Sequence, residues 1–434
     1  MSTGNSDMPA SHRQPGEDTS NSAASAGREL RIAFFGHDAN ESTIRKRVAA
    51  FRSAGAEILG LTFHRIRKSS SSAPSWHNID LGQTADAAFL KRLVAIAGSF
   101  GKLRAARAEL RNCNVIYARN IDMLSLAVAS KYAFALSAPI VYEALDIHQI
   151  FTTDGAKGRL MRSFERLLLK ATSLVVVSSP TFMSRYFEPV QGYRGPWYLL
   201  ENKVLLRSDA LEQARTEKKR MRTSPPWTIG WFGVLRCTES WAMLRRIAKE
   251  LGDKVVVHIR GTASEPDGIT DDELREICAR TSNMHFFGAY DGARDLDEIY
   301  GKVDIGWAVD YSAKGANSDW LIPNRVYESG VYNVPVIARR GTTTGDMVEK
   351  MHTGWVFDEP FAENVMAFLA ALDETRYSEV QDHLRAMPIN AFVDTDHSSE
   401  LVRRISAIIR EQGGPSATRK GADRIAVDRP TEPM

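Results

Sequence analysis

From Arg28 onward, the chain alternates short apolar runs with longer segments whose apolar residues recur every three or four positions. Such a run predicts a buried strand, and the longer spacing predicts an amphipathic helix. In the first half, the predicted strands are LRIAFFGH, EILGLTF, NVIYAR, PIVYEALD and SLVVVSS, and the predicted helices are 41–54, 86–111, 121–136 and 158–171. This alternation is typical of a parallel sheet with helices on both faces.

The second half repeats the pattern, with predicted strands WTIGWFG, KVVVHIRG, MHFFGAY, VDIGWAV, VPVIARR and GWVFDE. Between the halves lies a polar stretch rich in Lys and Arg that ends in Ser-Pro-Pro, which is typical of a linker. We therefore predict an α/β fold of two doubly wound domains that face each other across a cleft. The predicted segments are a disordered tail 1–27, a first domain 28–205, a linker 206–226, a second domain 227–388, a helical segment 389–412 that packs back on the first domain, and a disordered tail 413–434.

Composition adds limits on function. The chain has 434 residues, 25% charged residues and a net charge of +3, a balance that gives no indication of nucleic acid binding. Its three cysteines, Cys113, Cys237 and Cys278, are far apart, so neither a zinc site nor a disulfide framework is expected and a reducing cytoplasm fits best. No run of about 18 apolar residues is present, and residues 1–27 contain no apolar signal region. Any membrane contact is therefore expected to be peripheral, on the inner face of the cytoplasmic membrane.

The segment NSDWLIPNRVYESGVYNVPVIARR, residues 317–340, is the most informative part of the chain. Pro323 suits the first position of a helix, and Asn324 and Glu328 then share one face of that helix. The N-terminus of a helix attracts anions, and a carboxylate one turn later can accept hydrogen bonds from a ribose diol. The segment therefore predicts a site for a nucleoside diphosphate.

Within this segment, PNRVYESGVYNVPVIA resembles the P-x-K/R-x-x-E-x-x-x-x-G-x-P-V-I-A signature of the GT-B glycosyltransferases, in particular the bacterial group 1 or family 4 type. Asn333 stands where that signature usually has Gly, and WFGVLR, SLVVVSSPTF and HTGWVF are weaker matches. The resemblance implies transfer of a sugar from a UDP or GDP sugar to a lipid-linked saccharide during exopolysaccharide synthesis. It implies no prosthetic group or metal, and it implies that Glu328 binds the ribose of the donor.

Two departures from the family pattern concern the donor site. Many members have a second Glu eight positions before the one matched by Glu328, and this chain has Trp320 there, with Asp319 beside it. The usual Gly-Arg and Lys-Gly of the first turn in the second domain are also absent. Gly233 is followed by Val234, and Arg236 is the nearby cation, so we expect Arg236 to neutralise the phosphates.

Residues at the carboxyl ends of predicted parallel strands are expected to line the ligand site. The donor-binding candidates are Gly233, Arg236, Arg260, Asn317, Asn324, Arg325, Glu328, Thr342 and Thr343. Several have simpler interpretations: Arg325 as a solvated helix residue, Arg260 as a residue of the cleft rim, and the Gly-Thr loop at 341–345 as an ordinary turn.

In the first domain, YEALDIHQ places Glu143, Asp146 and His148 at the end of a strand. A His there could donate to the donor sugar or a phosphate oxygen, and a carboxylate could accept the proton of an acceptor hydroxyl. The alternative is a capping Asp and a surface His. The candidates for the acceptor pocket are His37, Asp38, Asn40, Arg45 and Arg119.

Two further patterns have competing interpretations. Residues 89–111 combine an apolar stripe with six cations, which fits either contact with anionic lipid or a helix packed on the sheet with a solvated basic face. The pair Asp295 and Asp297 matches the metal-binding D-x-D pattern, but it lies in a predicted amphipathic helix and is interpreted as coincidence.

Other functions remain open. A nucleotide-sugar epimerase of the same architecture needs no acceptor, and a non-catalytic relative that only binds nucleotide sugars is suggested by Trp320. A nicotinamide dehydrogenase is disfavoured because GHDANE after the first strand lacks the G-x-G-x-x-G turn.

Overall fold

The computed structural model describes residues 30–64, 73–83, 98–205, 224–292 and 294–413. In these residues the first domain contains a seven-stranded parallel sheet of order β3-β2-β1-β4-β5-β6-β7. Its strands are β1 (Arg31–Gly36), β2 (Glu57–His64), β3 (His77–Gln83), β4 (Val115–Arg119), β5 (Ile140–Ala144), β6 (Leu174–Val177) and β7 (Trp197–Leu199).

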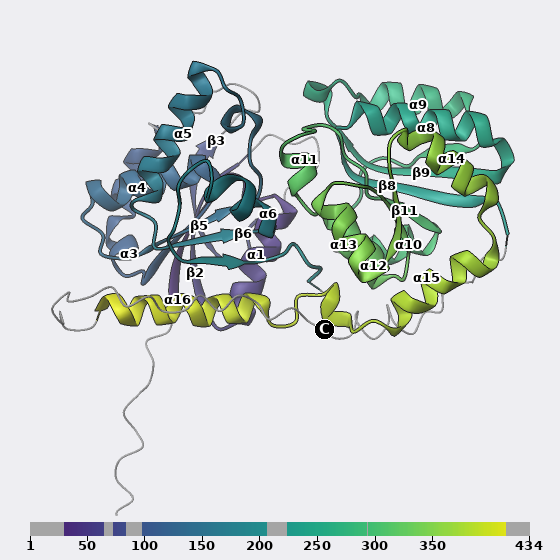
Figure 1. Ribbon diagram of the computed structural model, residues 1–434. Helices are drawn as coiled ribbons and strands as arrows, with labels where there is room; N and C mark the ends of the chain where they lie inside the picture. The colour runs from purple at the N-terminus through teal and green to yellow at the C-terminus, as the bar shows by residue number, and fades with distance from the viewer. Residues whose placement is uncertain (1–29, 65–72, 84–97, 206–223, 293, 414–434) are drawn as a thin grey trace, which may run out of the picture.

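Alternate residues of these strands feed two cores, one on each face of the sheet. Ala33 and Phe35 of β1 point into the core under α4 and α5, whereas Ile32 and Phe34 point into the core under α1 and α16. The helices of this domain are α1 (Ser42–Ser53), α3 (Arg107–Arg111), α4 (Asn120–Ala133), η1 (Gln149–Phe151), α5 (Ala156–Leu169), α6 (Pro180–Phe182) and η2 (Met183–Phe187). Helix α16 (His397–Gly413) comes from the end of the chain and packs beside α1, through Leu401 and Ile405 (Figure 1).

The second domain contains a six-stranded parallel sheet of order β10-β9-β8-β11-β12-β13. Its strands are β8 (Trp227–Leu235), β9 (Val255–Ala263), β10 (Met284–Phe286), β11 (Ile305–Trp307), β12 (Val336–Arg339) and β13 (Gly354–Phe357). Its helices are α8 (Thr238–Leu251), η3 (Gly252–Lys254), η4 (Glu265–Asp267), α9 (Asp271–Arg280), α10 (Leu296–Gly301), α11 (Asn317–Trp320), α12 (Asn324–Val331), α13 (Thr343–Met351), α14 (Phe361–Ala371), α15 (Glu374–Ala386) and η5 (Ile389–Ala391). Helices α8 and α14 cover one face, and α10, α12 and α13 cover the other.

The two domains meet at the carboxyl ends of their central strands. Trp320 and Leu321, from the second domain, pack against the core of the first domain. Ser179 Oγ donates to the Trp320 carbonyl at 2.5 Å, and the hydroxyls of Thr181 and Thr343 are 2.7 Å apart. Figure 1 shows α11 on the side of the second domain that faces the first. Ligand sites of doubly wound sheets lie at this edge, so the contact region is where a site is expected.

The prediction of two doubly wound α/β domains is confirmed. Strands β3 and β7 were not predicted, and both lie at edges of the first sheet. Strand β3 is more polar than the central strands, and β7 has only three residues. Most of the predicted linker, both predicted tails and the start of the predicted helix at 86–111 lie outside the described residues. No helix in the described ranges is long and apolar enough to cross a membrane.

Candidate functional site

The predicted nucleotide motif forms helix α12 and the strand that follows it. Pro323 has an extended backbone and is the N-cap, so the helix begins one residue later than predicted, at Asn324. Glu328 points inward and is only 5% exposed. Its Oε2 accepts a hydrogen bond from the Tyr300 hydroxyl of α10 at 3.0 Å. The carboxylate is therefore held in place by a buried tyrosine.

Two cations and a second tyrosine lie around this carboxylate. Burial raises the pKa of Tyr290, and the charge of Glu328 raises it further, while Arg325 and Arg260 oppose the shift. These groups are therefore close enough to influence one another. Within the described residues, Nη1 of Arg325 is buried and has no hydrogen-bond partner. Sequence reasoning named both arginines but not Tyr290, although this tyrosine follows β10 at the carboxyl end of the sheet.

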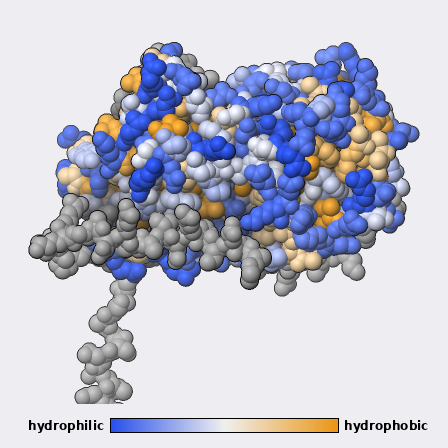
Figure 2. Space-filling model, in the orientation of Figure 1, coloured by the Kyte–Doolittle hydropathy of each residue, from blue (hydrophilic) through white to orange (hydrophobic). Residues whose placement is uncertain are grey.

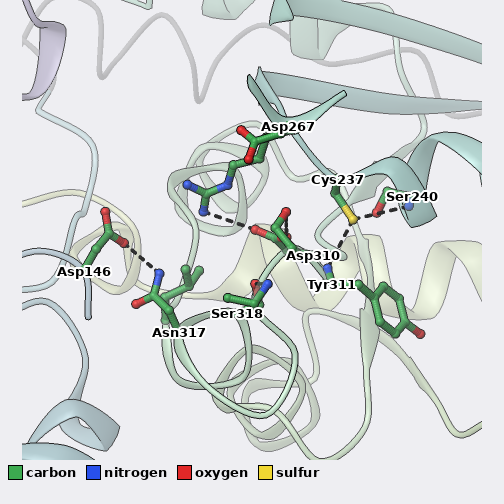
Figure 3. Close-up of polar contacts among 12 residues, drawn as sticks. Asp146, Cys237, Ser240, Asp267, Asp310, Tyr311, Asn317 and Ser318 are labelled. Atoms are coloured by element: carbon green, nitrogen blue, oxygen red, sulfur yellow. Dashed lines mark hydrogen bonds and ion pairs between the residues drawn. The ribbon is translucent and has the colours of Figure 1, made fainter. Parts of the chain in front are cut away.

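Arg236 lies just beyond β8, on a backbone that depends on two glycines. Gly233 has φ +109°, and a Cβ on Gly261 would lie 1.8 Å from the Gly233 carbonyl oxygen. Only glycine allows β8 and β9 to approach so closely at this end of the sheet. The next residue after Arg236, Cys237, has an Sγ that accepts from the N–H groups of Ser240 and Tyr311 (Figure 3). This contact ties the start of α8 to the segment after β11.

The guanidinium of Arg236 forms an ion pair with Asp310, with Nη2 3.3 Å from Oδ2. Burial alone would lower the pKa of Arg236, but Asp310, followed by Asp146 of the first domain, outweighs it and raises the pKa. Burial likewise opposes ionisation of Asp310, yet Ser312, Arg236 and Arg325 lower its pKa. Asp310 is therefore a buried carboxylate that faces two partly exposed cations of the same domain, Arg236 and Arg325.

A small pocket lies beside Asp310, between the start of α12 and the start of α13. It is lined by Ala308, Val309, Asp310, Ser318, Leu321, Pro323, Arg339, Thr342 and Thr344. Arg339 forms an ion pair with Asp319 and lies over the Tyr311 ring, 4.4 Å from the ring centroid. This lining combines two helix N-termini and the Arg339 cation with the Asp310 carboxylate, and Arg339 is already paired with Asp319.

Asn317, in the second domain, forms hydrogen bonds with the first domain through its side chain. Its Nδ2 donates to Asp146 Oδ1 at 3.1 Å, and its Oδ1 accepts from the Ile147 N–H at 2.9 Å (Figure 3). Nearby, Gln149 Nε2 donates to the Ser312 carbonyl. His148 is exposed, and its Nδ1 accepts from the Ile150 N–H, which caps the short helix η1. The structure therefore brings Asp146, Asn317 and Arg236 together, with His148 two residues from Asp146.

Glu143 and Arg119 do not reach this site. Both are about 1% exposed, and Arg119 Nε lies 2.9 Å from Glu143 Oε2. Arg47 binds the other carboxylate oxygen, with Nε and Nη2 at 3.1 and 3.0 Å. We therefore correct two predictions: Glu143 is not accessible to an acceptor hydroxyl, and Arg119 does not line an acceptor pocket. Both belong to a buried ion-pair cluster between β4, β5 and α1.

The loop after β1 is largely occupied with contacts inside the first domain. Asp38 is fully buried and accepts from the Asn40 N–H, which corrects its assignment to the acceptor pocket. Arg45 donates to the Asn40 side chain, and His37 forms an ion pair with Glu41. Burial opposes ionisation of Glu41, but His37 outweighs it and the pKa falls to about 2. His37 and Asn40 keep partial exposure and remain candidates for acceptor contact.

The Gly-Thr loop serves mainly to start helix α13. Thr342 Oγ1 accepts from the Gly345 N–H and donates to the Arg339 carbonyl, so its proton is used within the domain. Thr343 contacts Thr181 of the first domain. The side chain of Thr342 therefore caps the helix, and donor binding by this loop stays a prediction.

The departure at Trp320, the neighbouring Asp319 and Asp295 of the D-x-D pair have structural roles. Trp320 packs on the first domain, and Asp319 pairs with Arg339. Asp295 is the N-cap of α10, as expected for a coincidental D-x-D. In the described part of the chain, no group of three His, Cys, Asp or Glu side chains is placed to hold a metal ion.

Comparison with known proteins places this chain in a family. The chain is 33% identical to the succinoglycan biosynthesis protein ExoL of Rhizobium meliloti (strain 1021) over 382 residues, which cover 87% of this chain and 94% of that protein. No family model matches the chain.

Solved structures share the fold at low identity. Sucrose-phosphate synthase from Thermosynechococcus elongatus matches with a TM-score of 0.63 and 13% identity, over 87% of this chain and 99% of that one. Anabaena HepE in complex with UDP and glucose matches with a TM-score of 0.60 and 13% identity, over 87% and 100%. A glycosyltransferase from Rickettsia africae matches with a TM-score of 0.58 and 14% identity, over 88% and 99%. The predicted GT-B fold is thus confirmed, and the chain belongs to the family of the exopolysaccharide biosynthesis protein ExoL.

Proposed function

We propose that this chain transfers a sugar from a nucleoside diphosphate sugar to a hydroxyl of a lipid-linked saccharide during exopolysaccharide assembly. The family relationship and the GT-B fold support a glycosyltransferase of this pathway. The observation that carries the proposal is the meeting of Arg236, Asp310 and Asn317 with Asp146 across the domain boundary. Charged groups of both domains thus converge where the fold places its ligand site.

On the donor side, Glu328 binds the ribose diol, and Arg236, Arg325 and the N-terminus of α12 bind the diphosphate. A diphosphate carries more negative charge than the Asp310 carboxylate, so it competes for the Arg236 guanidinium that Asp310 holds in this structure. Arg260 and Asn324 complete the donor contacts. These groups stabilise the negative charge that grows on the leaving diphosphate as the glycosidic bond breaks.

On the acceptor side, Asp146 and His148 are exposed polar residues that follow β5. The acceptor oxygen forms a bond to the anomeric carbon, the bond from that carbon to the diphosphate oxygen breaks, and the acceptor proton passes to a base. Asp146 is suited to accept this proton because its carboxylate lies at the domain boundary with one oxygen bound to Asn317. His148 is suited to donate to the donor sugar or a phosphate oxygen.

A uridine nucleotide is the donor we favour, because the similar protein HepE was solved with UDP and glucose. Arginine charges and helix N-termini supply the electrostatic stabilisation, so we propose that no metal is required. We further propose a cytoplasmic location with peripheral contact at the inner membrane surface, where a lipid-linked acceptor would be found.

Thermal-shift titration with UDP, GDP and their glucose conjugates tests donor binding. A ligand that binds only the folded protein raises its stability by RT ln(1 + [L]/Kd). We expect a shift with UDP-glucose that Arg236→Ala and Glu328→Ala remove. Arg246→Ala serves as the control, because Arg246 lies in an exposed ion-pair network with Glu250 and Glu363 and should keep the shift.

Product analysis then separates the alternatives. Transfer to a saccharide acceptor supports the proposal. Conversion of the donor to an isomer without an acceptor would show that the protein is an epimerase. Donor binding without turnover over a panel of acceptors would show that it is a non-catalytic relative.

A further inference from the structure

Helix α5 exposes three large apolar side chains on one face. Leu160 is 70% exposed, Phe164 40% and Leu167 62%. Residues spaced by three or four positions lie on the same side of a helix, so these three form one continuous stripe. Single exposed apolar residues are common on protein surfaces, whereas a stripe of three on one helix marks an interaction surface.

The opposite face of α5 is firmly anchored, so the stripe is a fixed feature of the fold. Leu168 and Leu169 are buried in the core of the first domain. Glu165, which is 2% exposed, accepts hydrogen bonds from the Tyr142 hydroxyl at 3.2 Å and from Gln191 Nε2 at 2.6 Å. Rotating the helix to hide the stripe would expose these residues and break the bonds of Glu165.

Positive charge surrounds the stripe. Lys157, Arg159, Arg166 and Lys170 are exposed, and Glu165 is the only acidic residue of the helix. Arg159 donates to the Asp154 carbonyl, and Arg166 donates to the carbonyls of Val190 and Gln191. Because these acceptors are neutral, the hydrogen bonds orient the guanidinium groups without cancelling their charge. In the part of the chain that the structure describes, none of the four cations forms an ion pair.

The location of α5 connects this face to the candidate site. The helix begins ten residues after Asp146 and lies on the outside of the first domain (Figure 1). Figure 2 shows apolar residues among hydrophilic ones on this part of the surface. Val190, whose carbonyl accepts from Arg166, is itself 36% exposed and extends the apolar area.

The helix that the sequence suggested for membrane contact, 89–111, is a weaker candidate. Residues 84–97 lie outside the described residues. In the remainder, Leu103 and Leu110 are buried in the core, and Lys102 donates to the Asp80 carbonyl. The described apolar residues of that segment therefore face the sheet, which agrees with the simpler interpretation.

We propose that the face formed by Leu160, Phe164 and Leu167, with the cations around it, docks on the surface of an anionic lipid bilayer. An amphipathic helix in this position inserts its apolar side chains at the headgroup boundary while its lysines and arginines pair with anionic headgroups. This inference extends the proposed use of a lipid-linked acceptor. Lipid binding can be measured without sugar transfer, so each proposal can fail while the other holds.

Co-sedimentation of the full chain with vesicles tests the inference. One set contains phosphatidylcholine with about one-third phosphatidylglycerol, and the other contains phosphatidylcholine alone. The variants are Leu160→Glu with Phe164→Glu, and Lys157→Glu with Lys170→Glu. Phe287→Glu and Arg280→Glu are matched controls, because Phe287 is 52% exposed and Arg280 is exposed on α9 of the second domain. Circular dichroism and melting temperature establish that every variant is folded.

We expect the wild type to bind the anionic vesicles and each α5 variant to bind about tenfold or more weakly. The reason is that both the cations near a charged surface and the inserted apolar side chains contribute to binding. Binding should also weaken in high salt. The inference is overturned if the α5 variants bind like the controls, or if neutral vesicles bind equally well. It is also overturned if the wild type is a dimer that the double variant Leu160→Glu with Phe164→Glu dissociates, because a second copy of the chain would then cover this face.

Discussion

Replacing Glu143 by Gln removes the carboxylate that directly contacts two buried guanidinium groups. Arg119 and Arg47 both contact Glu143, on different oxygens. The guanidinium groups also donate to neutral hydroxyls, Arg119 to Thr43 and Arg47 to Ser398, each at 3.3 Å. Glutamine has nearly the same shape but no charge, so the substitution leaves the two buried cations with only the more distant charges of Glu41, which acts on Arg119, and Asp394, which acts on Arg47.

The expected cost follows from this arrangement. Breaking a buried ion pair by removing one partner destabilises a protein by about 3–5 kcal/mol, and here two pairs lose the same partner. Burial alone would raise the pKa of Glu143, but Arg119 and Arg47 outweigh it and lower the pKa. Because the pKa is lowered in the folded state, this stabilisation is complete above the ordinary carboxyl pKa and is lost as the pH falls through the folded-state value.

Urea unfolding of the first domain, followed by circular dichroism at neutral pH, measures the effect. We expect the free energy of unfolding to fall by about 3–5 kcal/mol in Glu143→Gln. Adding Arg47→Met should recover part of the loss, because one uncompensated charge is then removed. Glu250→Gln, in an exposed pair with Arg246, is the control and should leave the midpoint unchanged. A Glu143→Gln variant that kept full stability but lost sugar transfer would refute the reasoning and restore a catalytic role for Glu143.

Three further predictions follow from single contacts. Burial raises the pKa of Glu165 to about 6, so the free energy of unfolding should fall by about 2 kcal/mol as the pH rises from about 4.5 to about 6. The difference in unfolding free energy between wild type and Glu165→Gln should change across this range, and a constant difference would contradict the raised pKa. Asn333 has φ +54°, so Asn333→Val should lower the free energy of unfolding by about 1–2 kcal/mol in urea denaturation, while Asn333→Gly should leave it nearly unchanged. Equal losses of stability in the two variants would count against backbone strain at this position. Asn317→Ala should leave the Ile147 N–H without its partner and weaken the contact between the domains by about 1–3 kcal/mol. Small-angle scattering should then show a larger radius of gyration, and an unchanged radius would argue against this contact.

The central strands could be predicted from the sequence because a strand buried on both faces is a continuous apolar run. Strand β6, LVVV, and strand β12, VIAR, are buried at every residue. The edge strand β3, HNIDLGQ, carries polar residues because one of its sides has no neighbouring strand and its faces are less covered. A local pattern of this kind does not distinguish an edge strand from a loop.

The nucleotide motif could also be predicted in outline. The sequence placed Asn324 and Glu328 on one helix, since this depends only on local helix geometry. It did not indicate that Tyr300, 28 residues earlier, would bind Glu328, because the contact arises from the packing of α10 against α12. Asn333 in place of the usual Gly is explained by its left-handed backbone, which asparagine tolerates.

The assignment of polar residues to the site depended on tertiary structure. Glu143 and Asp146 are three residues apart, yet Glu143 is buried between two arginines and Asp146 is exposed at the domain boundary. The sequence by itself determined the class of fold, the two domains and the position of the nucleotide motif, because these follow from hydrophobic periodicity and local helix geometry. Only the tertiary structure decided which charges reach the shared site and which neutralise one another inside a domain, because burial and partners come from segments far apart in the chain.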